Sequence, residues 1–222
     1  MTSARELYER TVAELAPAAA GNRLVELVEA GVAPREALRR IAGEEHRIIR
    51  SDRRSFALLA ARFADRGRAA PFFLGLAAGE GEALGLLTPF ATAVGLSPAD
   101  LATYRSRPAA QTYPHYLAWL AQSGTLAETV LALLANFGFW GGYCARLAAA
   151  LPRHYGLSAE ATAFFAFFAA LPPDFESEAL ALLQSALDDG ESAAEARHAA
   201  RLMQSYESSF WAAVLPADAP RT

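Results

Sequence analysis

Hydrophobic residues recur along most of this chain at spacings of three and four, which is the pattern of amphipathic α-helices. In the segment 35–65, such positions are occupied by Leu38, Ile41, Ile48, Phe56, Leu59 and Phe63. The pattern is interrupted where Pro, Gly or a helix-capping residue occurs, as expected where helices end and begin. It predicts helices over residues 2–20, 22–30, 35–65, 71–94, 111–122, 126–151, 158–170, 177–188 and 192–214, with a further short helix after Ser97. No segment shows a convincing strand pattern.

Two of the predicted helices contain glycines, which disfavour the interior of a helix. Gly79 and Gly81 could divide the helix at 71–94 into two. The segment 126–151 is apolar on nearly every face, which predicts a helix in the middle of the domain. It also contains glycines at three positions, each of which costs a helix interior about 1 kcal/mol relative to alanine. These glycines are Gly138, Gly141 and Gly142. Either tight packing against another helix or close approach of a ligand would explain them.

The length and composition are those of one helix-rich domain. The chain has 222 residues, of which 53% are hydrophobic and 20% charged, enough to bury one large core with a cavity inside it. We therefore expect a single domain over residues 1–222 with an all-α fold, a compact helical bundle. Residues 216–222 are expected to form a flexible tail.

Charge and cysteine content exclude several classes of function. A formal net charge of -4 gives no general attraction for nucleic acid. Cys144 is the only cysteine, which excludes an internal disulfide framework and a cysteine-rich metal site. Residues 1–10 lack the apolar core of a secretory signal, and the other apolar runs are punctuated by Pro, Gly or charge. We expect a cytoplasmic protein with no membrane span.

Two glutamates stand among apolar residues and are the candidate catalytic groups. Glu45 is flanked at helical spacing by Ile41, Ile48 and Ile49, and Glu207 by Met203, Phe210 and Trp211. A carboxylate in such a place must find a partner or take up a proton, because burying it unpaired costs several kcal/mol. Glu45 could instead form an ion pair with a nearby arginine, and Glu207 could bond a tyrosine or a helix-end amide.

The central segment and its neighbours supply candidate ligand-binding residues. Asn136 could hold a ligand through its amide or satisfy a buried polar partner, and the two readings are equally supported. The aromatic candidates are Tyr113, Phe137, Trp140 and Tyr143, although aromatic residues are more often part of a core. The four histidines do not share a helix at metal-ligand spacing, so we expect neither a metal nor another cofactor.

Three motifs resemble the TenA (thiaminase II-like) family of the haem-oxygenase-like fold. They are the segment Tyr116–Gly124 with the following Leu-Ala-Glu, the helix from Glu45 through Phe56-Ala57, and the terminal Tyr206-Glu207-Ser208-Ser209-Phe210-Trp211. The resemblance implies a haem-oxygenase-like bundle with an internal pocket for an aminopyrimidine. It also implies an early acidic residue, a tyrosine, a nucleophilic cysteine and a late glutamate, which match Glu45, Tyr113, Asn136 and Glu207. A neighbouring aromatic of the family corresponds to Ile48, which we include among the ligand-binding residues.

The chain departs from the family pattern at the nucleophile. Asn136 stands where the resemblance calls for cysteine, and an amide cannot form the covalent intermediate that a thiolate can. Cys144 lies eight residues further on, about 12 Å along a helix axis, so it cannot replace the missing sulfur. A second branch of the fold builds a di-metal site, but this chain has phenylalanines over 164–168 where that branch has ligands.

The sequence thus predicts a TenA-like protein that binds a small planar or amphipathic metabolite, such as an aminopyrimidine or related amine. Any catalysis would be acid-base chemistry, as in a thiaminase II-like hydrolase relative without a cysteine nucleophile, and whether the protein is an enzyme stays open. The alternatives are a non-catalytic interaction or regulatory protein and a metal-dependent oxidase of the same fold. The resemblance also implies a homo-oligomer, a dimer or tetramer, and a place in thiamine-related metabolism.

Overall fold

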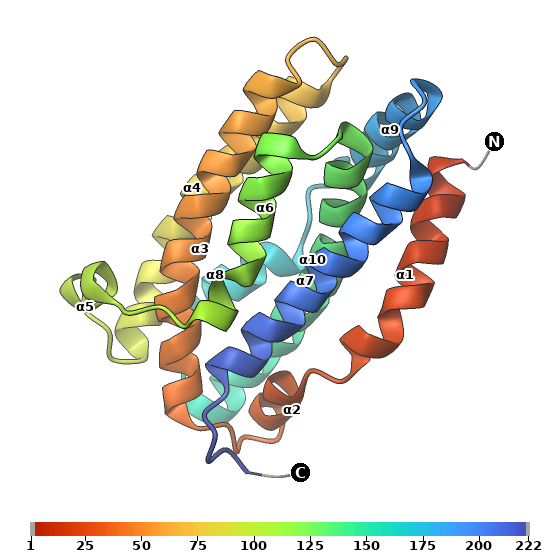
Figure 1. Ribbon diagram of the computed structural model, residues 1–222. Coiled ribbons are helices and arrows are strands. Elements are labelled where there is room, and N and C mark those ends of the chain that lie inside the picture. The colour runs from red at the N-terminus through yellow and green to blue at the C-terminus, as the bar shows by residue number, and fades with distance from the viewer. Residues whose placement is uncertain (1–2, 221–222) are drawn as a thin grey trace.

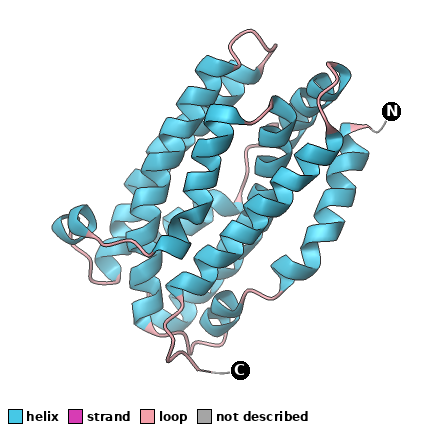
Figure 2. Cartoon of the chain, viewed as in Figure 1, coloured by secondary structure: helices cyan, strands magenta, loops and turns pink. Residues whose placement is uncertain are grey.

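Helices account for most of the chain in the computed structural model, which describes residues 3–220 apart from the side chains of 17, 18 and 20 (Figures 1 and 2). No strand occurs within that range. The α-helices are α1 (Ala4–Ala20), α2 (Arg23–Glu29), α3 (Arg35–Arg62), α4 (Ala69–Ala93), α5 (Pro98–Thr103), α6 (Thr112–Ser123), α7 (Leu126–Tyr155), α8 (Ala159–Ala169), α9 (Phe175–Asp188) and α10 (Ala193–Val214). The predicted all-α fold is confirmed. A short 3₁₀ helix, η1 (Pro108–Gln111), was not predicted.

Local sequence signals fix most helix ends. Ser3 and Thr125 cap α1 and α7, and each forms a capping box with the glutamate three residues on. The prediction that α7 ends at 151 is wrong, because the helix continues through Pro152 to Tyr155. It stops at Gly156, whose φ of 68° is in the left-handed region that favours glycine.

The glycines of α4 do not divide the helix, which the sequence had left open. The helix runs unbroken through Gly79, Gly81 and Pro89. The helix packs against α3 and α8. This packing offsets the roughly 1 kcal/mol of helix stability that each glycine costs relative to alanine. By length and composition alone, α4 is long and apolar enough to cross a membrane, and 33% of its most apolar 18-residue stretch is buried. This is weak evidence for a membrane span, because the core helix of a globular protein can have the same length and composition.

The helices form a bundle around α7, as the sequence predicts. α3 and α4 lie side by side as an antiparallel pair, α10 packs along α7, and α8 bridges α7 and α4 (Figure 1). From Leu126 to Asn136 every residue of α7 except Glu128 is buried. Two apolar clusters fill the bundle, one containing Ile48 and Phe210 and the other lying against Phe137. Tyr113 packs against both, so it marks the boundary between them.

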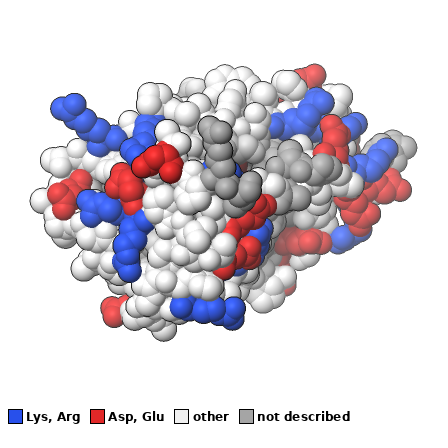
Figure 3. Space-filling model, turned by 90° about the horizontal axis from the view of Figure 1, so that it is seen from below, with Lys and Arg blue, Asp and Glu red and all other residues white. Residues whose placement is uncertain are grey.

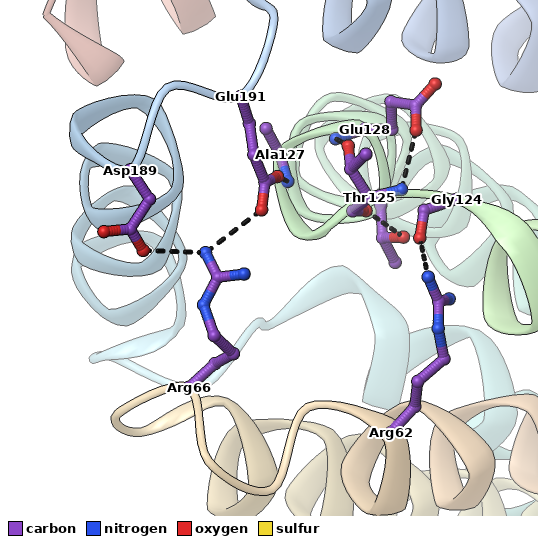
Figure 4. Close-up of polar contacts among 9 residues, drawn as sticks. Arg62, Arg66, Gly124, Thr125, Ala127, Glu128, Asp189 and Glu191 are labelled. Atoms are coloured by element: carbon purple, nitrogen blue, oxygen red, sulfur yellow. Dashed lines mark hydrogen bonds and ion pairs between the residues drawn. The ribbon is translucent and has the colours of Figure 1, made fainter.

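Arg62, the last residue of α3, and Arg66, in the turn between α3 and α4, fasten one end of the bundle (Figure 4). Arg66 bridges Asp189, at 2.9 Å, and Glu191, at 3.0 Å, across the turn between α9 and α10. Glu191 in turn accepts the backbone N–H of Ala127 at 2.7 Å. Arg62 donates to the backbone oxygens of three residues at the C-terminal end of α6: Leu120, Ala121 and Gly124. These contacts tie α3 to the end of α6, and the α3–α4 turn to the α9–α10 turn and through it to the start of α7.

The C-terminal segment lies against the beginning of α2. Pro216 and Ala219 are buried, and Arg23 donates to the backbone oxygens of Ala219 and Pro220. The last two residues of the expected tail, 221–222, lie outside the described part of the chain. The face seen from below carries acidic and basic side chains interspersed, with no large field of either sign (Figure 3).

Candidate functional site

A small cavity of about 40 Å³ lies inside the bundle where α3, α4, α6, α7, α8 and α10 meet. Its lining contains seven of the eight predicted site residues: Glu45, Ile48, Tyr113, Asn136, Phe137, Trp140 and Glu207. The remaining lining residues are Asp52, Glu80, Phe168 and Phe210. Residues that are far apart in the sequence are therefore brought to one place, with four carboxyl groups among them. We call this the acid cavity.

Helix α3 contributes Glu45, Ile48 and Asp52 to the acid cavity. Positions i, i+3 and i+7 lie on one face of a helix, so the three side chains point the same way. Glu45 is 4% exposed and Asp52 3% exposed. The alternative of an ion pair for Glu45 is not found among the described residues, and Arg47 donates instead to the backbone oxygen of Tyr104.

The neighbouring Glu44 has a different role, although it is equally buried. Its two oxygens accept the backbone N–H of Arg107, at 2.8 Å, and the side-chain amide of Gln111, at 2.7 Å. These bonds fasten the connection between α5 and α6 onto α3. Glu44 is thus an anchor of the fold, whereas Glu45 faces the cavity.

Glu207 on α10 is held by two N–H donors. The indole N–H of Trp211, one turn further along α10, donates to Oε1 at 3.1 Å. The side-chain amide of Asn136 on α7 donates to Oε2. Of the two roles open to Asn136, the structure therefore provides the buried polar partner, while the residue also lines the cavity.

All four carboxyl groups of the acid cavity have pKa values above their ordinary values. Burial raises the pKa of Glu207 to about 8, although its hydrogen bonds from Trp211 and Asn136 act in the opposite direction. Burial also raises the pKa of Glu80 to about 8. The pKa values of Glu45 and Asp52 lie well above their ordinary values because of burial first and the neighbouring carboxylates second.

No basic residue lines the acid cavity within the described chain. Burial, with the nearby acids adding to it, also raises the pKa of the Tyr113 hydroxyl well above 10, so this residue stays a neutral hydrogen-bonding group. Clustered carboxylates without a counter-charge must hold protons or a bound cation near neutral pH. The site is therefore built to accept positive charge or N–H donors.

Tyr143 is the predicted site residue that does not line the acid cavity. It lies seven residues beyond Asn136, about 10 Å along the helix by its rise per residue. Its hydroxyl donates to the backbone oxygen of Ala19 at 2.6 Å, and its ring packs edge-on against Trp211 with centroids 5.4 Å apart. The contacts that the structure shows for Tyr143 are therefore structural ones.

Glu80 is the most important lining residue that sequence reasoning missed. It lies in the apolar helix α4 with Leu76 and Leu84 four residues away on either side, the same signal that drew attention to Glu45 and Glu207. Asp52, seven residues after Glu45 and on the same face of α3, was also not among the predicted site residues. Phe168 belongs to the aromatic run at 164–168, which the sequence analysis used only as an argument against a metal site.

The described residues contain no group of three or more His, Cys, Asp or Glu placed to hold a metal ion. Two of the phenylalanines in the run at 164–168, Phe164 and Phe165, are fully buried. Cys144 is also fully buried and does not line the acid cavity. Burial, with Glu45 and Glu207 adding to it, raises the pKa of its thiol well above 9.

Solved structures share this fold across almost the entire chain. A domain of unknown function with a heme oxygenase-like fold from Shewanella denitrificans matches with a TM-score of 0.79 and 14% identity, covering 96% of this chain and 92% of the other. A TenA family transcription regulator from Silicibacter gives 0.75 and 21%, covering 95% and 97%. A TenA homolog from Pseudomonas syringae gives 0.78 and 16%, covering 93% and 91%.

The sequence itself carries the family assignment. No curated protein matches it significantly. The sequence model of the TENA/THI-4/PQQC family, however, matches residues 23–217, which include every residue of the acid cavity. The chain belongs to the TENA/THI-4/PQQC family and has its haem-oxygenase-like, all-helical fold.

Proposed function

We propose that this TenA-like protein binds a small planar metabolite bearing an amino group, such as an aminopyrimidine or related amine, with the amino group in the acid cavity. One observation carries the proposal: four buried carboxyl groups converge on a cavity that no basic residue lines within the described chain. An amine supplies the missing positive charge or N–H donors, and hydrogen bonds to charged groups contribute about 1.5–3 kcal/mol each. Aromatic walls from Phe137 and Trp140 suit a planar ring.

The proposed binding is non-covalent. Asn136 cannot act as a nucleophile, and its amide is already bonded to Glu207. Cys144, the chain's only cysteine, lies outside the cavity lining and is held as a neutral thiol. Neither residue offers the thiolate that a covalent intermediate needs.

If the bound amine is transformed, Glu207 is the group suited to the proton transfers. With a pKa near 8 it is mostly protonated at neutral pH, so it can donate a proton and later take one back. The N–H donors of Trp211 and Asn136 fix its position. Glu45 faces the same cavity and supplies a second carboxyl group for orientation or proton exchange.

Calorimetric titration with 4-aminopyrimidine tests the proposal. Glu207→Gln keeps the shape of the side chain but removes the carboxyl group that can ionise to pair with the amine, so affinity should fall by about tenfold or more, the equivalent of one charged hydrogen bond. Glu44→Gln is the control for Glu45→Gln, because both positions are buried and only Glu45 lines the cavity. Unchanged affinity in both Glu207→Gln and Glu45→Gln would reject the assignment.

A further inference from the structure

A second, larger chamber adjoins the acid cavity. Its volume is about 280 Å³, and it lies between α4, α8 and the beginning of α9. The two spaces share four lining residues, Glu80, Phe137, Trp140 and Phe168. The rings of Trp140 and Phe168 meet edge to face with centroids 5.9 Å apart, so they form the boundary between the two spaces. We call the larger space the aromatic chamber.

The size of the acid cavity limits what it can hold. A single water needs roughly 10–15 Å³ of such space, so about 40 Å³ admits a few water-sized groups. That is room for an ammonium or amidine head and not for a whole ligand of metabolite size. The remainder of any ligand whose head reaches Glu207 must therefore lie elsewhere, and the aromatic chamber is the adjoining space.

The chemistry of the aromatic chamber selects an apolar body. Its walls are mainly aromatic and aliphatic: Phe72, Leu76, Phe137, Trp140, Phe167, Phe168, Leu171, Pro172 and Phe175. Only two lining residues are charged, and one of them, Glu80, belongs to the acid cavity as well. The other, Glu178, is paired with Arg68 at 2.7 Å. The chamber therefore offers apolar contact rather than further recognition of charge.

Two glycines on α4 keep the chamber open. Gly75 and Gly79 lie one turn apart and both line it. A Cβ atom at Gly79 would lie 3.8 Å from the ring of Phe167, and one at Gly75 would have no neighbour within 4 Å. Both positions therefore have room for a larger side chain at the wall of the chamber. Helix α4 therefore presents the carboxyl group of Glu80 to the acid cavity, and two glycines without side chains to the aromatic chamber.

We propose that the ligand is an amphipathic amine whose charged head lies among the four acids and whose apolar body passes Trp140 and Phe168 into the aromatic chamber. This inference rests on the proposed function, because it takes the acid cavity as the site of the amine. It adds the substrate class: an amine that carries several carbons of alkyl or aryl chain. Binding then combines a charged head contact with burial of an apolar tail.

Titration calorimetry with straight-chain primary amines from methylamine to octylamine, and with the matching alcohols, tests the inference. Each methylene that enters the chamber should strengthen binding by up to about fourfold, until the chamber is full. Gly79→Leu should abolish this gain and leave the affinity for the shortest amines unchanged. Gly75→Leu is a second blocking variant, and leucine favours the helix more than glycine does at both positions. Gly85→Leu is the control, because Gly85 is exposed on the same helix and lines neither space.

The outcomes separate this inference from the function on which it rests. If short amines bind and lose affinity in Glu207→Gln, but chain length has no effect, the inference is overturned and the proposed function stands. The same holds if the gain with length survives in both Gly79→Leu and Gly75→Leu. If alcohols bind as well as amines of equal length, the head contact with the acids is wrong, and the amine assignment fails with it.

Discussion

Asn136 on α7 donates its side-chain amide to Glu207 on α10, which joins the two central helices at the wall of the acid cavity. Asn136 occupies the position at which the family resemblance calls for a nucleophilic cysteine. In the structure, the amide of Asn136 is a donor that supports the ionised form of the buried Glu207 carboxyl group.

Removing this donor should weaken amine binding in a pH-dependent manner. In Asn136→Ala, Glu207 loses one of the two hydrogen bonds that oppose the effect of burial, so its pKa rises further above 8. The carboxylate is then scarcer at pH 7.5, and affinity for an amine should fall by about tenfold. Much of that loss should return at pH 9, which titration calorimetry at both pH values measures.

A double-mutant cycle is the control for this prediction. Adding Asn136→Ala to Glu207→Gln should cause little further loss of affinity, because the hydrogen bond is already altered. Additive losses would show that Asn136 acts on the ligand directly rather than through Glu207.

The stability of the protein should decrease as pH rises from about 5 to 8. Glu80 and Glu207 titrate near pH 8 in the folded state and near their ordinary value of 4.5 when unfolded. Between these values the folded state binds more protons, so each group lowers the free energy of unfolding by about 1.4 kcal/mol per pH unit. This stability is fully present below pH 4.5 and is lost as pH rises through 8. Urea denaturation at several pH values measures the slope.

Glu80→Gln isolates the contribution of one carboxyl group. Because glutamine does not titrate, the free energy of unfolding should fall less steeply with pH in this variant, by the contribution of one carboxyl group. Glu82→Gln is the matched control, because Glu82 is exposed two residues further along α4 and should leave the slope unchanged. A slope that is the same in wild type and in Glu80→Gln would refute the account of Glu80.

The helices could be predicted from sequence because their signals are local. Apolar spacing, capping boxes such as Thr125 with Glu128, and glycine at helix ends all act within a few residues. The misses also had physical causes. Continuation of α4 through Gly79 and Gly81 depends on its packing against α3 and α8, which spacing within one segment does not reveal. The end of α7 is a different case, because residues 152–154 are exposed and the local stop signal is Gly156, not Pro152.

The cavity was partly predictable for the same reason. Glu45 and Glu207 stand out because apolar residues surround them in sequence, and Glu80 has a similar setting that was overlooked. Which of these acids share one cavity is a tertiary property. The position of Tyr143 shows the limit, because its bond to Ala19 depends on where α1 lies and not on the pattern of α7.

Arg62 should matter for stability and not for binding. It donates to three backbone oxygens at the end of α6, and their loss in Arg62→Met should reduce the free energy of unfolding by about 1–3 kcal/mol. Arg66→Met is the comparison, because Arg66 is partly exposed in its ion pairs and should lose about 1 kcal/mol or less. Urea denaturation measures both, and amine affinity should be unaltered. Reduced affinity in a folded Arg62→Met protein would mean that this end of the bundle is coupled to the acid cavity.

Cys144 should be unreactive in the native protein and dispensable for binding. Its side chain is fully buried, and burial together with Glu45 and Glu207 raises the pKa of its thiol, so the reactive thiolate is suppressed. A thiol reagent such as dithiobis-nitrobenzoate should therefore modify it only after denaturation. Cys144→Ala should bind 4-aminopyrimidine as wild type does, apart from a small loss of stability from the smaller side chain. Rapid modification of the folded protein that is blocked by the bound amine would place this sulfur at the site and contradict a non-covalent mechanism.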